Sequence, residues 1–221
     1  MTQNKTQNPQ QSLAKNSKKS TRSRVLTLCE FGMLVAVEIV MSVTPLGYLN
    51  LPFLAASLLT IPVAIGAIML GTWASTALGL LFGITSFIKG FSSTAPMTVA
   101  MYAGSIPAAF AVAVGGRVLM GLCTGLLVQG VREAVKKKSI ADNIVGSLAA
   151  PVLNTVFFMG LLMVFYYHSD YIQGLARTTG ITNPFLLIGV MVGTQALIEA
   201  AVCGVVSTAV SKALQTALHR D

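Results

Sequence analysis

The stretch ADNIVGSLAAPVLNTVFFMGLLMVFYY, residues 141–167, decides the fold class of this chain. It contains one charged side chain, Asp142. It exceeds the roughly 20 mainly apolar residues that a helix needs to cross a bilayer. The whole chain has the same character: of its 221 residues 54% are hydrophobic and 10% are charged, and the mean hydropathy is +0.74. Soluble domains carry about 25% charged residues, so we predict an all-α integral membrane protein.

Glycine, proline and charged residues divide the rest of the chain into further apolar segments. The predicted membrane-spanning helices are six: residues 25–46, 55–70, 73–91, 112–131, 141–167 and 185–215. The second is the shortest, and Pro62 interrupts it. Segment 92–111 contains Pro96 and Pro107, which favours a long loop with a short helix across the mouth of the bundle. A re-entrant helix is the alternative there.

The amino-terminal segment 1–24 is polar and basic, with six Lys and Arg residues. Its small apolar content predicts a disordered cytoplasmic tail, followed by one membrane domain over residues 25–217. A cleaved signal peptide is the alternative. The apolar stretch is longer than an ordinary signal and is not followed by an A-x-A cleavage site, so we predict a retained first helix.

The basic residues divide unevenly between the two sides of the membrane. With a cytoplasmic amino terminus, the inner side carries twelve of the 15 Lys and Arg residues, located in 1–24, 132–138 and 212–220, and the outer side carries Lys89, Arg117 and Arg177. This asymmetry predicts that both termini are cytoplasmic in the cell membrane. Residues 45–54, 90–111 and 168–184 are then the long outer connections, where a binding site would be covered.

Several kinds of chemistry are missing from the sequence. No G-x-x-x-x-G-K-[ST] motif is present, so the chain does not hydrolyse nucleotides by that route. The two histidines, His168 and His219, lie at predicted segment ends and form no H-E-x-x-H, so we predict no enzyme. Cys29, Cys123 and Cys203 lie in apolar runs without ligand spacing, so we expect no metal site, disulfide or cofactor. Since the positive charge follows the membrane topology, we also expect no nucleic-acid partner.

Ionisable side chains inside predicted spans are candidate functional residues, because each is costly in a bilayer. They are Glu38, Arg117 and Glu199. Glu38 and Arg117 lie at similar depth in the outer half of the membrane. They therefore form an ion pair, or Arg117 is left to bind an anionic ligand group, since a guanidinium matches a carboxylate bidentately.

Uncharged polar residues accompany these charges in the last two spans. Gln195 and Glu199 are four residues apart and share a helix face, and Asn154 lies in the span before. Such residues either join helices by hydrogen bonds or line a ligand cavity beneath the outer loops. Tyr48 and Phe53, in the first outer loop, either wall that cavity or anchor the loop at the interface.

Small residues recur at four-residue spacing in two of the predicted helices. The pairs are Gly32 with Ala36 and Gly79 with Gly83. This spacing lets helix backbones approach closely, either inside the bundle or against another membrane protein.

Six pieces of the sequence together resemble one family of transport proteins. They are TPLGYLNLPF (44–53), TIPVAIGAIMLG (60–71), ALGLLFGITSFIKGF (77–91), RVLMGLCTGLL (117–127), PVLNTVFFMGLL (151–162) and TQALIEAAVCGVV (194–206). Their order and spacing are similar to the S components, the substrate-binding subunits, of energy-coupling factor (ECF) vitamin transporters. The resemblance implies a six-helix bundle that takes up a vitamin from outside. It also implies a membrane T component and two cytoplasmic ATPases as partners.

Within that family the chain looks most like the pantothenate branch, because of its TPLG and IPV patterns and the Asn-Thr pair at 154–155. The resemblance implies that Arg117 binds the pantothenate carboxylate. Asn154, Gln195 and Glu199 would contact its polar groups. The Gly32 and Ala36 pair stands where the family has its helix 1 coupling motif. A pyridoxine-type or hydroxymethylpyrimidine ligand is the alternative, as is an autonomous carrier with Glu199 as its proton carrier.

Overall fold

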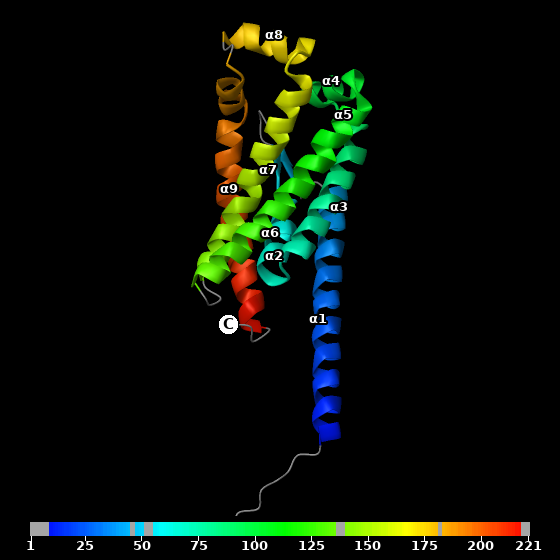
Figure 1. Ribbon diagram of the computed structural model, residues 1–221. Coiled ribbons are helices and arrows are strands. Elements are labelled where there is room, and N and C mark those ends of the chain that lie inside the picture. Colours follow the sequence, from blue (N-terminus) through cyan, green and yellow to red (C-terminus); the bar gives the residue numbers. More distant parts are fainter. Residues whose placement is uncertain (1–8, 45–46, 51–54, 136–139, 181–182, 218–221) are drawn as a thin grey trace, which may run out of the picture.

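The computed structural model describes residues 9–44, 47–50, 55–135, 140–180 and 183–217. Over these residues the protein is a bundle of long helices with a short two-stranded hairpin inside it (Figure 1). The elements are α1 (Pro9–Val43), β1 (Tyr48–Asn50), β2 (Ala55–Ser57), α2 (Thr60–Met69), α3 (Thr72–Gly90), α4 (Pro96–Gly104), α5 (Ile106–Phe110), the π-helical turn η2 (Ala111–Gly115), α6 (Gly116–Val135), α7 (Ile140–Tyr166), α8 (Asp170–Thr179) and α9 (Pro184–Ala217).

The two ends of the bundle are built differently. The start of α1 and the end of α9 lie at one end, which we call the terminal end, while α4, α5 and α8 lie at the other, which we call the loop end (Figure 1). The loop end thus carries two of the predicted long connections, and the short helix predicted across the mouth is α4. The first described helix therefore begins, and the last described helix ends, at the same end of the bundle (Figure 1).

Within the described ranges four helices are long and apolar enough to cross a membrane: Arg24–Val43, Ile106–Val135, Ala141–Tyr166 and Leu197–Ala217. They correspond to four of the six predicted spans. A fifth prediction, 73–91, matches α3 in position. The turn between α2 and α3 lies at Gly71, whose φ of +94° suits a residue without a side chain.

The predicted second span, 55–70, is not one helix. Ala55–Ser57 instead pairs antiparallel with Tyr48–Asn50, and α2 begins only at Thr60. Pro62 falls in the first turn of α2, where a missing N–H costs nothing. A ten-residue helix is about 15 Å long, half of a bilayer core. Its residues from Thr60 to Ile68 are all buried, so α2 is the centre of the bundle.

The first helix begins earlier than predicted. α1 starts at Pro9 and not at residue 25, so much of the segment predicted to be a disordered tail continues the first span as helix. Residues 9–24 are rich in Gln, Lys and Arg, which have good helix propensity. Extending an existing helix also avoids the cost of nucleation. Residues 1–8 lie outside the described part of the chain.

Glycines bring α3 into close contact with η2 and α6. A methyl group on Gly83 of α3 would lie 2.8 Å from the Cα of Val114, and one on Gly125 of α6 would lie 2.7 Å from the Ser75 hydroxyl oxygen. Gly79 likewise abuts the Arg117 carbonyl. The Gly79 and Gly83 pair is therefore internal packing and not a partner surface.

We expect Gly83→Ala to destabilise the bundle by roughly 1–3 kcal/mol, because its methyl group meets backbone that must move. Thermal unfolding of the purified protein in detergent measures this change. Gly130→Ala in α6 is the matched control, since nothing lies within 4 Å of its added methyl group. Equal unfolding temperatures for the two variants would show that the close contact is not limiting.

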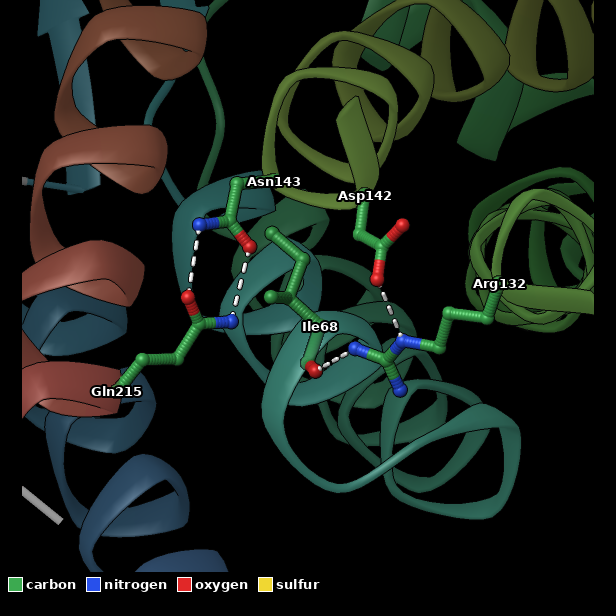
Figure 2. A network of polar contacts seen from close by, with 5 residues as sticks. All are labelled: Ile68, Arg132, Asp142, Asn143 and Gln215. Carbon is green, nitrogen blue, oxygen red and sulfur yellow. Dashed lines mark hydrogen bonds and ion pairs between the residues drawn. The ribbon is translucent and has the colours of Figure 1, made fainter. Parts of the chain in front are cut away.

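Polar side chains join four helices at the terminal end (Figure 2). Arg132 of α6 donates from Nε to Asp142 of α7 at 2.9 Å, and also to the Ile68 carbonyl near the end of α2. Asn143 and Gln215 exchange two amide hydrogen bonds, each 3.0 Å long, between α7 and α9. The Ile68 carbonyl is near a helix end, where carbonyls lack partners within the helix. This network closes the terminal end of the bundle.

The loop end is held by α7 and α8. The Tyr166 hydroxyl lies 2.8 Å from the Met101 carbonyl and 2.7 Å from the Ser105 carbonyl, joining α7 to the α4–α5 turn. Ser169 caps α8 by accepting from the Ile172 N–H, and Gly180 ends that helix with a φ of +69°. Segment 168–184, predicted as an outer connection, thus contains a capped helix.

Candidate functional site

A buried cluster of polar side chains lies where α6, α7 and α9 meet the hairpin. Glu199 of α9 is 3% exposed, and Arg117 of α6 and Asn154 of α7 are each 8% exposed. The Glu199 carboxylate lies beside the Asn154 side chain and the Ser57 backbone, and it is in the field of the Arg117 charge. Three predicted site residues from three helices are therefore neighbours.

Arg117 is held by a local irregularity and by aromatic rings. It follows η2, and its Nη1 donates to the carbonyl of Val112 within that turn at 3.5 Å. Its Cζ lies 4.3 Å from the centroid of Phe158 and 5.1 Å from that of Phe82. Such rings stabilise a cation away from water. π-Helical turns are frequent at functional sites, and the sequence carries no signal for this one.

The predicted ion pair between Glu38 and Arg117 is not formed. Glu38 is fully buried, and neither of its carboxylate oxygens has a hydrogen-bond partner within the described residues. α1 packs mainly against α2 and α3, whereas Arg117 belongs to α6 and shares a cluster with Glu199. A similar predicted depth did not place the two charges together, because α1 packs mainly against α2 and α3 and not against α6.

Two further residues, which the sequence did not single out, extend the cluster. The Thr60 hydroxyl and the Cys203 thiol lie 3.1 Å apart, and both side chains are fully buried. Cys203 is one helical turn after Glu199, and Thr60 begins α2. An isolated Thr or Cys in an apolar run gives no sequence signal. The same holds for Ser57, which contributes only its backbone.

The remaining predicted binding residues are placed only in part. Tyr48 is in β1 and pairs with Ser57, so its backbone lies beside the cluster. Gln195 is in α9 one turn before Glu199, but its side chain is outside the described part. Phe53 also lies outside the described residues. The contacts of these three side chains stay predictions.

The predicted partner surface is exposed. Gly32 and Ala36 both lie on the open side of α1, and nothing is within 4 Å of a methyl group added at Gly32. The opposite side of the helix, with Leu34 and Glu38, is buried. The strip formed by Gly32 and Ala36 is thus available to another membrane helix.

Chemically, the cluster combines a guanidinium, a carboxylate and an amide in an apolar surrounding. Groups of this kind bind a small molecule that carries both an anionic group and hydrogen-bonding groups. Within the described ranges no group of three or more His, Cys, Asp or Glu residues is arranged to hold a metal ion.

Comparison with known proteins assigns this architecture. Residues 26–211 match the family described as "ECF transporter, substrate-specific component". The chain belongs to this family. A solved structure of ThiT from Listeria monocytogenes is similar in fold, with a TM-score of 0.56 and 22% sequence identity. The likeness covers 86% of this chain and 96% of that one. No curated protein matches the chain.

As an ECF S component, the chain is a membrane subunit for transport and not an enzyme. The family implies a vitamin as ligand, with a T component and ATPases as partners. The resemblance seen in the sequence is confirmed at the level of the family. The similarity to ThiT supports the fold, and at 22% identity it does not extend to the ligand.

Proposed function

We propose that this S component binds pantothenate for an ATP-driven importer. The observation that carries the proposal is the cluster of Arg117, Asn154 and Glu199, which is buried and contains one cation. Pantothenate has one carboxylate, one amide and two hydroxyl groups. Arg117 takes the carboxylate, while Glu199 accepts from a hydroxyl and Asn154 contacts the amide. Gln195, Tyr48 and Phe53 complete the site in this proposal.

The charged end of the proposed site also has an apolar surrounding. Phe82 and Phe158 flank the Arg117 guanidinium. The two methylene groups that join the carboxylate of pantothenate to its amide would lie beside these rings. A pyridoxine-type or hydroxymethylpyrimidine ligand lacks a carboxylate and would make no bidentate contact with the guanidinium. The presence of Arg117 in the cluster therefore favours the acid.

For the membrane arrangement we propose six crossings with both termini in the cytoplasm. α1, α3, the α5–α6 rod, α7 and α9 each cross, and the hairpin with α2 makes the sixth passage. The terminal end then faces the cytoplasm, in agreement with twelve of 15 basic residues on that side. The loop end faces outward, so the cluster beneath the hairpin is reached from outside.

A ligand panel tests the proposal. Binding of pantothenate, pyridoxine, hydroxymethylpyrimidine, thiamine and riboflavin to the purified chain is measured by calorimetry in detergent. We expect pantothenate to bind about a hundredfold more tightly than the others, since only it supplies the buried cation with a carboxylate. Tighter binding of another vitamin would show that this vitamin, and not pantothenate, is the ligand. Failure of a T component and ATPases to co-purify from the native membrane would contradict the transporter assembly.

A further inference from the structure

A groove lies between α1 and α3 near the terminal end, away from the buried cluster. It is lined by Arg24, Thr27 and Leu28 of α1 and by Trp73 of α3, with a volume of about 250 Å³. The Phe31 ring packs against Trp73, with its centroid 4.8 Å from that of the Trp73 ring. Leu28 is 67% exposed and Trp73 52%, so the groove opens to the surroundings of the bundle.

The groove lies at a boundary between apolar and polar surroundings. The apolar span of α1 begins at Arg24, and α3 begins at Thr72, immediately before Trp73. Trp side chains gather at the headgroup level of bilayers, and an Arg at a helix end reaches the same level. The groove therefore has a cationic end at the headgroups and an apolar end within the hydrocarbon.

The sequence on the amino-terminal side of the groove carries charge of one sign. Residues 1–24 contain six Lys and Arg residues and no Asp or Glu, and α1 continues without a break from Pro9 through Arg24. Basic residues next to a membrane span attract anionic lipids. We propose that the groove is a binding site for an anionic phospholipid, with its phosphate on Arg24 and an acyl chain along Leu28 and Trp73. The site is separate from vitamin binding.

The chain has its own reporter for this site, because Trp73 is its only tryptophan. The full-length protein is placed in nanodiscs of phosphatidylcholine that contain a small fraction of phospholipid with brominated acyl chains, which quench indole fluorescence on contact. We expect brominated phosphatidylglycerol to be enriched at Trp73 by about fivefold over brominated phosphatidylcholine, the factor for one basic residue near the surface. Equal quenching by the two lipids would overturn the proposal.

Variants of Arg24 test whether its side chain causes the preference for phosphatidylglycerol. Arg24→Gln is expected to remove the preference, and Arg24→Lys to retain most of it. Arg177→Gln is the matched control, since Arg177 is exposed on α8 at the loop end. Arg24 is also exposed, so its replacement leaves the core intact. A preference that survives in Arg24→Gln contradicts the assignment.

Two further experiments distinguish a bound lipid from other occupants of the groove. Inorganic phosphate should reduce the preference no more than chloride at equal ionic strength, and a specific loss with phosphate would show a site for a soluble anion instead. The measurement is then repeated on the transporter assembled with its T component. Persistent quenching by phosphatidylglycerol is expected, whereas complete protection of Trp73 would show that a protein covers the groove.

Discussion

Arg117→Gln is expected to weaken pantothenate binding by two or more orders of magnitude. In the proposed complex the guanidinium and the ligand carboxylate are both removed from water, so losing one leaves the other buried without its partner. Such a loss costs about 2–5 kcal/mol. Arg117→Lys should recover only part of the affinity, because an ammonium cannot contact both carboxylate oxygens as a guanidinium fork does.

Calorimetry on the purified variants measures this effect, with Arg177→Gln as the control for loss of one positive charge. Pantothenol, in which an alcohol replaces the carboxylate, provides the complementary test. It should bind the unmodified protein poorly and should lose little further affinity in Arg117→Gln. If acid and alcohol bind equally well, Arg117 does not contact the carboxylate. A thermal unfolding curve for Arg117→Gln separates lost binding from lost structure.

Gly32→Trp and Ala36→Trp are expected to abolish uptake while vitamin binding to the isolated subunit stays intact. Both positions are exposed on α1, and Gly32 has no neighbour within 4 Å of an added methyl group. A bulky side chain there is accommodated in the isolated bundle. It would nevertheless hold a partner helix several ångströms away, where the close packing of small residues is lost.

Co-purification with the T component and ATP-dependent uptake into vesicles measure this loss. Val205→Trp is the matched control, because it places the same ring on α9, where Val205 is 71% exposed. That variant should assemble and transport normally. Normal uptake by both α1 variants would show that the strip faces lipid, and loss of vitamin binding would show that it supports the site from within.

Much of the fold can be predicted from the sequence where the apolar pattern is compatible with only one kind of element, a long helix. The spans 73–91, 141–167 and 185–215 agree with α3, α7 and α9 in position, because long apolar runs end at glycines or polar residues. The short helix in 92–111 follows from its prolines, and α4 begins at Pro96. In these segments composition and length alone decide the structure.

The structure differs from the prediction in segments whose conformation is determined by tertiary contacts. Residues 55–70 are mainly apolar, and only pairing with 48–50 distinguishes a strand and a short central helix from one span. Residues 9–24 look disordered in isolation but continue a helix that the membrane segment has already nucleated. The π-helical turn before Arg117 has no composition signal at all.

The candidate site also has a part that the sequence predicts and a part that depends on helix packing. Arg117, Asn154 and Glu199 were found because polar groups inside apolar spans are rare. Their association was not predictable residue by residue, since Glu38 satisfied the same criterion and lies elsewhere in the bundle. Ser57 lies beside Glu199 through its backbone, which carries no signal specific to the residue type. Sequence identifies candidate side chains, and helix packing selects among them.

The position of the hairpin against Glu199 has a kinetic consequence for the proposed complex. The Ser57 backbone lies beside the Glu199 carboxylate, which is 3% exposed and which the proposed ligand would also contact. In that complex the hairpin would have to move away from Glu199 before the final contacts form. We therefore expect association in two steps, with an observed rate that approaches a plateau set by hairpin opening as ligand concentration rises. The hairpin, once closed again over a bound ligand, would lengthen the residence time of that ligand.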